Sequence, residues 1–201
     1  IQNNQPSYVL NGYIMGNLFL EASTRSRLSF DAAFKRIGGE VINFAGIEVS
    51  SMAKGETLAD TIRVLHSYCD IIVMRHPEYG AAREAARYSK VPIINAGDGD
   101  NEHPTQALLD LYTIFEEKRE RGNDIAGLTI SIVGDLKFGR TAHSLAKLLT
   151  LYKGIRYIFV APPEFQMPAS LIDEIRFKGF EVVQTDDFEA GIRDSDIVYM
   201  T

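Results

Sequence analysis

The stretch YIMGNLFLEASTRSRLSF, residues 13–30, fixes the order of secondary structure on which the rest of the fold depends. Its apolar part, residues 13–20, predicts a buried strand. Apolar side chains then recur at roughly helical spacing at Leu28, Phe30, Phe34 and Ile37. The predicted order is therefore a strand, a polar turn and a helix.

The polar turn between this strand and this helix is rich in hydrogen-bond donors, because Ser23, Thr24 and Ser26 alternate with Arg25 and Arg27. The first N–H groups of a helix are unpaired, and the helix dipole favours an anion beside them. An arginine fork can bind two oxygens of a phosphate or carboxylate at once. In the alternative reading, Ser23 or Thr24 only caps the helix and the arginines face solvent. The turn is a candidate anion site that needs support from elsewhere in the chain.

Composition and charge narrow the class of protein. With 201 residues, 45% of them hydrophobic and 24% charged, the chain is typical of a soluble globular protein with a core. The formal net charge of −6 argues against non-specific nucleic-acid binding. No apolar run approaches the ~20 residues of a membrane helix, and the opening IQNNQPSY lacks signal-peptide character, so we expect no membrane association and a cytoplasmic location. Cys69, the only cysteine, is expected in the core.

Strands alternate with helices in both halves of the chain, which predicts parallel sheets with right-handed crossovers. Further strands are predicted at 41–44, 71–74, 91–96, 128–133, 155–160 and 180–183, with another beginning at 197–199. Further helices are predicted at 58–65, 81–88, 142–151 and 171–177, and another begins at His103-Pro104 and carries the apolar residues of 108–115. The mixed-charge segment 116–124 interrupts this pattern and predicts a domain boundary. We therefore expect an α/β protein with two doubly wound parallel-sheet domains, residues 1–120 and 121–201.

Polar side chains follow two of the predicted strands. Arg75 comes directly after 71–74, while His103 and Gln106 come after 91–96 and a polar loop. In open α/β sheets ligands bind beyond the carboxyl ends of the strands, so these side chains are candidates for a binding site. In the alternative reading, Arg75 is a solvated residue at a strand end and His103 marks a helix boundary without chemistry.

The loop AGIEVSSMAKGET, residues 45–57, carries further donors at Ser50 and Lys54. Binding residues are common on such loops, although a solvated connection is the alternative. The acidic loop GDGDNE, residues 97–102, does not match a calcium loop, which needs glycine at its sixth and glutamate at its twelfth position. Counted from Asp98, this chain has histidine and leucine there, and no metal site is predicted.

GDLKFGRT, residues 134–141, nearly matches the phosphate-binding loop GxxxxGK[ST]. Arg140 stands where that loop needs lysine, and Asp135 would place negative charge inside the phosphate cradle. No convincing magnesium-binding aspartate follows in the later strands. Two roles for this loop therefore stay open. It binds a nucleotide, or its Arg140 binds a carboxylate.

Five ordered motifs together resemble those of the aspartate/ornithine carbamoyltransferase family, and more closely its aspartate carbamoyltransferase catalytic chains. They are STRSRLSF at 23–30, SSMAKGETLADT at 50–61, VMRHPEYGAAR at 73–83, NAGDGDNEHPTQALLDLYT at 95–113 and VGDLKFGRTAHS at 133–144. The resemblance covers nearly the whole chain. It implies that residues 1–120 bind carbamoyl phosphate and that residues 121–201 are an incomplete aspartate-binding domain.

The resemblance also implies roles for the residues that match the family motifs. The phosphate of carbamoyl phosphate would be held by Ser23, Thr24, Arg25 and Ser26. Its carbonyl would be polarised by Arg75, His103 and the hydroxyl of Ser26, as an oxyanion site requires. Its amino group would be bound by Gln106.

The aspartate half of the site is implied in the same way. Arg140 and Lys54 would bind L-aspartate, with Ser50 and Lys54 entering from a neighbouring subunit of a homotrimer with shared active sites. The implied catalytic set is Arg25, Arg75, His103 and Lys54. No metal or organic cofactor is implied, and regulatory chains or a dihydroorotase partner are left open.

The implied activity is transfer of the carbamoyl group to the α-amino group of L-aspartate, giving N-carbamoyl-L-aspartate and phosphate in pyrimidine biosynthesis. Two alternatives are a non-catalytic carbamoyl-phosphate-binding or assembly module of the same family, and a nucleotide-binding protein built on 134–141. Ser26 departs from the family's usual threonine but keeps the hydroxyl. The family's N-terminal helix, its HPLPR motif and its closing helix are absent, so we expect a partial chain.

Overall fold

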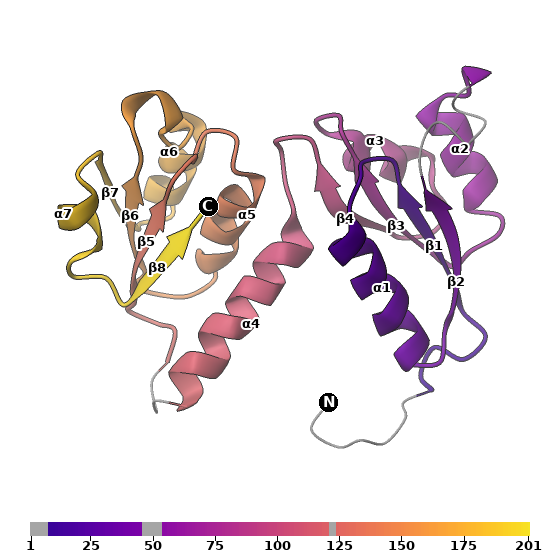
Figure 1. Cartoon of the computed structure of the whole chain (residues 1–201), viewed down its shortest axis with the longest axis horizontal. Helices are drawn as coiled ribbons and strands as arrows, with labels where there is room; N and C mark the ends of the chain where they lie inside the picture. The colour runs from indigo at the N-terminus through magenta and orange to yellow at the C-terminus, as the bar shows by residue number, and fades with distance from the viewer. Residues whose placement is uncertain (1–7, 46–53, 121–123) are drawn as a thin grey trace. The chain divides into compact units, whose positions relative to one another are not determined.

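The computed structural model describes residues 8–45, 54–120 and 124–201 and divides into two compact units, 1–99 and 100–201 (Figure 1). Each unit contains a four-stranded sheet whose paired strands are all parallel. The expected α/β class with two parallel sheets is therefore confirmed. Within the described ranges, no helix has the length and apolar character needed to cross a bilayer.

The sheet of the first unit has the strand order β2-β1-β3-β4. Its strands are β1 (Ile14–Phe19), β2 (Glu40–Ala45), β3 (Ile71–His76) and β4 (Ile93–Asp98). Its helices are α1 (Thr24–Arg36), α2 (Leu58–Leu65) and α3 (Ala81–Tyr88). Each strand of this parallel sheet is preceded or followed by a helical connection, as the alternation in the sequence predicts.

Successive residues of β1 serve the two faces of this sheet. Met15 and Phe19 join the core on the face where Phe30 and Phe34 of α1 pack. Leu18 lies in the other cluster, which includes residues of α2 and α3. Because both faces are covered, the strand is apolar almost throughout, which explains the continuous apolar run in the sequence.

Cys69 is buried at 7% exposure in the second of these clusters, which confirms its predicted place in the core. Its thiol donates to the carbonyl of Leu65 at 3.0 Å, and burial raises the pKa of this thiol. A buried thiol kept in its neutral form is a packing residue rather than a nucleophile.

The sheet of the second unit has the strand order β7-β6-β5-β8. Its strands are β5 (Thr129–Val133), β6 (Arg156–Val160), β7 (Glu181–Thr185) and β8 (Ile197–Met200). Its helices are α4 (Pro104–Glu120), α5 (Arg140–Leu149), α6 (Ala169–Phe177), α7 (Phe188–Ile192) and the short 3₁₀ helix η3 (Pro163–Phe165). Tyr157 and Phe159 of β6 are fully buried in its main core.

The place of α4 distinguishes the compact units from the domains expected from sequence. The mixed-charge segment 116–124 predicts a boundary near 120, whereas the contacts divide the chain at Gly99. Ala107 and Ile114 of α4 are buried in the core cluster of the second sheet, so this helix packs as part of the second unit. A break in apolar pattern locates the end of a helix but does not determine the sheet against which that helix packs.

Candidate functional site

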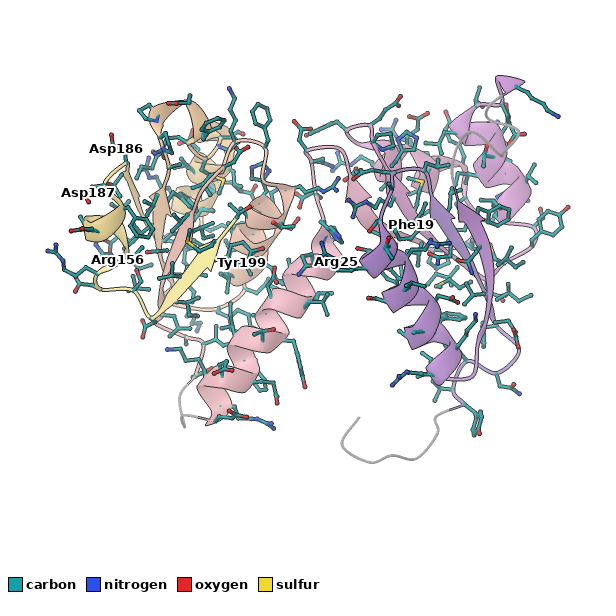
Figure 2. The ribbon with its side chains drawn as sticks, in the orientation of Figure 1. Phe19, Arg25, Arg156, Asp186, Asp187 and Tyr199 are labelled. Carbon is teal, nitrogen blue, oxygen red and sulfur yellow. The ribbon has the colours of Figure 1, made fainter. Side chains whose placement is uncertain are left out.

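The start of α1 carries the four residues predicted to hold an anion. Ser23 is the N-cap residue in an extended conformation, and Thr24 begins the helix. As far as the described residues go, Ser23 makes no side-chain capping hydrogen bond and the first turn holds no acidic side chain. Arg25 is exposed in this turn (Figure 2), while Ser26 is half-buried. The reading of Ser23 as a cap alone is therefore not supported, because its hydroxyl is not used in that way.

Arg75 is brought beside this helix start by the register of the sheet. Phe19 of β1 pairs with Arg75 of β3, and the N–H of Leu20 donates to the Arg75 carbonyl at 2.9 Å. The Arg75 side chain is only 13% exposed. Strand β3 runs to His76, so Arg75 lies within the strand and not just after it, as the sequence suggested. The register thus places Arg75 beside the end of β1, from which the chain leads into α1.

Glu21 pairs with Arg75 and was not identified from the sequence. Its Oε1 accepts from the Arg75 guanidinium at 2.5 Å to Nη2 and 3.2 Å to Nε. These two hydrogen bonds fix the plane of the Arg75 guanidinium. Glu21, which accepts them, lies two residues before Ser23 in the chain. The available signal was the position of Glu21 inside the polar turn itself, one residue after the apolar run.

His76, the neighbour of Arg75, is a buried histidine at 5% exposure. Its Nδ1 accepts the backbone N–H of Glu78 at 3.0 Å, which holds the turn after β3. Burial lowers the pKa of His76, although the nearby carboxylates of Glu78, Glu84 and Asp98 oppose that shift. The ring is therefore kept neutral and structural in the folded protein.

We expect His76 to make the protein less stable as the pH falls below about 6.5, the ordinary histidine pKa. Because the folded-state pKa is lower, the unfolded chain takes up the proton first, and the free energy of unfolding falls until the folded-state pKa is passed. The slope is limited to one proton, about 1.4 kcal/mol per pH unit. His76→Asn should flatten this dependence. Urea unfolding of both proteins at pH 7, 6 and 5 would test it, and parallel slopes would contradict it.

His103 lies immediately before α4 and is buried at 6% exposure. Its Nδ1 accepts the backbone N–H of Gln106 at 3.4 Å and lies 3.3 Å from the Thr105 hydroxyl. Since an N–H can only donate, the neutral ring carries its proton on Nε2. That tautomer can donate to a carbonyl oxygen, which is the role expected of this side chain.

The segment before α4 is held by side chains of α5. The N–H of His103 donates to the Ser144 hydroxyl at 2.9 Å. Ser144 in turn donates to the carboxylate of Glu102, and Lys147 forms an ion pair with the same carboxylate. Sequence reasoning did not identify these three residues, because their link to His103 requires the packing of α5 against α4.

Gln106 belongs to a second set of polar contacts in this unit. Its Nε2 donates to Asp110 Oδ1 at 2.9 Å, one helical turn along α4. The hydroxyl of Tyr199 on β8 donates to Asp110 Oδ2 at 3.1 Å. Burial raises the pKa of Tyr199, so its hydroxyl stays protonated as a donor. Both oxygens of the Asp110 carboxylate therefore have partners.

The loop before α5 does not form a phosphate cradle. Oδ1 of Asp135 accepts the backbone N–H groups of Lys137 and Phe138 at 3.1 and 3.0 Å. These are amides that a phosphate-binding loop would present to its ligand. Because the Asp135 carboxylate already occupies these amides, the loop argues against the nucleotide-binding alternative. Arg140, half-buried, is the first residue of α5.

The predicted site residues thus fall into two groups, one in each compact unit. The first unit brings Ser23, Thr24, Arg25 and Ser26 together with Arg75, while the second holds His103, Gln106 and Arg140. Lys54 is exposed in the segment before α2, and Ser50 lies outside the described residues. In the ranges that the structure covers, no group of three or more histidine, cysteine, aspartate or glutamate side chains is placed to hold a metal ion.

Comparisons with known proteins point to one family. Residues 1–116 match the family model for the carbamoyl-P binding domain of aspartate/ornithine carbamoyltransferases. The chain is 52% identical over 193 residues to an aspartate carbamoyltransferase catalytic subunit of Dichelobacter nodosus, covering 96% of this chain and 56% of that protein. It therefore spans little more than half the length of this relative.

Solved structures agree with this match. The catalytic subunit of Methanocaldococcus jannaschii aspartate transcarbamoylase is similar with a TM-score of 0.85 and 50% identity, covering 98% of this chain and 63% of that one. Aspartate transcarbamoylase from Trypanosoma cruzi, in complex with carbamoyl phosphate and aspartate, gives 0.90 and 45%, covering 98% and 65%. With its fold, its motifs and this similarity in agreement, the chain belongs to the aspartate/ornithine carbamoyltransferase family.

Proposed function

We propose that the protein containing this chain transfers the carbamoyl group of carbamoyl phosphate to the α-amino group of L-aspartate. The observation that carries the proposal is the start of α1, where exposed Arg25 and an uncapped helix terminus lie beside Arg75 at the end of β3. Helix N–H groups and two guanidinium groups suit a small dianion. Relatives of about 50% identity are named aspartate carbamoyltransferase catalytic subunits, which supports this choice of substrates.

The phosphate end of the first substrate is assigned to the turn before α1 and its first residues. Ser23, Thr24, Arg25 and Ser26 hold the phosphate through hydroxyl, guanidinium and backbone donors. Arg25 contributes the bidentate, charge-assisted pair that a phosphate favours. On this proposal residues 1–120 form the carbamoyl-phosphate-binding domain and residues 121–201 belong to the aspartate-binding domain.

The carbamoyl carbonyl is polarised by donors that gain strength as negative charge grows on its oxygen. Arg75, His103 Nε2 and the Ser26 hydroxyl take this role, while Gln106 binds the amino group. The neutral amine of aspartate attacks the carbamoyl carbon, a C–N bond forms, and the bond to the phosphate oxygen breaks. The amine proton leaves with the phosphate. Catalysis then consists of orienting two anions and stabilising a tetrahedral intermediate.

L-Aspartate itself is assigned to Arg140 and Lys54. We place Ser50 and Lys54 in the active site of a neighbouring subunit, which makes the protein a homotrimer with shared sites. The product, N-carbamoyl-L-aspartate, makes the reaction a step of pyrimidine biosynthesis. The cytoplasmic location and the presence of regulatory chains or a dihydroorotase partner stay predictions.

The complete protein should form N-carbamoyl-L-aspartate from carbamoyl phosphate and L-aspartate, with L-ornithine as the matched control amine. Mass spectrometry of the products separates the two amines in one experiment. Product from ornithine alone would overturn the assignment to aspartate. Tight binding of carbamoyl phosphate without any product would favour the non-catalytic module, and calorimetric titration with ATP serves as the control ligand.

A further inference from the structure

A carboxylate on α4 holds the side chain to which we assign the carbamoyl amino group. We propose that Asp110 is a positioning residue that fixes the orientation of the Gln106 amide, with Tyr199 as its anchor, so that the site selects an acyl phosphate bearing an amino group. This inference rests on the proposed function. It concerns two residues that neither the motifs nor the reaction chemistry had assigned.

The orientation of the Gln106 amide follows from the chemistry of its partner. Asp110 Oδ1 lies 2.9 Å from Gln106 Nε2. An ionised carboxylate can only accept hydrogen bonds, so the –NH₂ end of the amide must face Asp110 and the carbonyl Oε1 must face away. A glutamine without such a partner can exchange its two ends at little cost. Asp110 therefore decides which end of Gln106 is presented to a ligand.

Asp110 is itself held from a different element of the fold. The hydroxyl of Tyr199, labelled on β8 in Figure 2, donates to Asp110 Oδ2 at 3.1 Å. Tyr199 also forms a side-chain hydrogen bond with Thr141, the residue after Arg140 on α5. The carboxylate is thus fixed between α4 and β8, and the contact continues to the start of α5. Such a connected set orients Gln106 more firmly than one helical pair of side chains would.

The consequence for specificity is a difference between two ligands of nearly the same shape. The amino group of carbamoyl phosphate can donate to Gln106 Oε1, whereas acetyl phosphate has a methyl group in its place. With the amide reversed, two –NH₂ groups would face each other and the preference would disappear. A site built to pair with a substrate N–H rejects an analogue that lacks it, because its own polar group is left unpaired.

The test uses the complete protein with carbamoyl phosphate, acetyl phosphate and inorganic phosphate as ligands in calorimetry. Asp110→Ala should raise the Kd for carbamoyl phosphate about tenfold, while the Kd values for acetyl phosphate and phosphate change less than about twofold. Tyr199→Phe should have a smaller effect of the same kind. Asp173→Ala is the matched control, since Asp173 is an exposed aspartate on α6 of the same unit.

The outcomes separate this inference from the proposed function. If the unaltered protein does not bind carbamoyl phosphate, the proposed function fails and the inference fails with it. If it binds, but Asp110→Ala weakens all three ligands equally or none of them, Asp110 has only a structural role and the inference is wrong. Should that variant fail to fold, Asp110→Asn keeps the shape. Its amide can meet Gln106 with either end, so the preference for carbamoyl phosphate over acetyl phosphate should fall.

Discussion

Arg25→Ala is expected to weaken the binding of carbamoyl phosphate by roughly 100-fold or more. The substitution removes a bidentate, charge-assisted partner of the phosphate and leaves the anion with hydroxyl and backbone donors alone. Arg25 is exposed in the first turn of α1, so the fold should not depend on it. Calorimetric titration of the complete protein with carbamoyl phosphate measures the change directly.

Two further variants sharpen this test. Arg25→Lys should lie between the unaltered protein and the alanine variant, because lysine keeps the charge but lacks the planar fork. Arg36→Ala removes the same charge from the last turn of the same helix and should leave the affinity nearly unchanged. Equal affinities for Arg25→Ala and Arg36→Ala would show that the phosphate is bound elsewhere.

A mixture of Arg25→Ala and Lys54→Ala subunits is expected to recover about a quarter of the normal activity, although each variant alone is nearly inactive. Suppose that every site takes Arg25 from one subunit and Lys54 from the next. A site is then intact only when the first subunit is the Lys54→Ala variant, which keeps Arg25, and the second is the Arg25→Ala variant, which keeps Lys54. Random assembly gives each position a chance of about one half, hence about one quarter for the pair. The measurement is carbamoyl aspartate formation after dissociation and reassembly of equal amounts.

A control must show that the subunits exchange. One variant is labelled with isotopes, and native mass spectrometry then detects trimers that contain both variants. Mixed trimers without recovered activity would place Arg25 and Lys54 in the same subunit and contradict the shared site. Subunits that carry both substitutions, mixed with Arg25→Ala subunits, should recover no activity, because no subunit in that mixture supplies Arg25. That arrangement separates complementation from a general effect of mixing.

Much of the fold could be predicted because the strands have apolar runs and most of the helices have periodic ones, whereas the short helix α7 was not predicted. The segment 71–74 identified β3, and 108–115 lies within α4. The apolar pattern alone covers neither element in full, although His103-Pro104 correctly indicated the start of α4 and the mixed charges of 116–124 its solvated end. Polar residues such as Arg75 and His76 continue the β3 ladder, and α4 extends to Glu120 with charged residues on its solvated end. Backbone hydrogen bonds, which the side-chain pattern does not report, set these ends.

The candidate site was predictable only as far as local motifs reach. The turn at 23–27 and the residues around His103 carry their chemistry in consecutive positions, so the sequence shows it. Other contacts join residues that are far apart in the chain. Glu21 pairs with Arg75 across 54 positions, Ser144 with His103 across 41, and Tyr199 with Asp110 across 89. No local pattern indicates such pairs, because parallel pairing and helix packing create them. The pair of Gln106 and Asp110 was not identified either, although its i, i+4 spacing on one helix face is a local pattern.

The Asp135 carboxylate bears on which of the two strand–loop–helix segments can bind a dissolved anion. Its carboxylate is tethered two and three residues from the amides that it occupies. A tethered ligand competes at an effective concentration of about millimolar or above, so a dissolved phosphate metabolite has little chance of displacing it. The strand, loop and helix that open the first unit and those that lead into α5 are built alike. On the proposed function, only the first binds an anion that exchanges with solution, because two amides of the second are already occupied by Asp135.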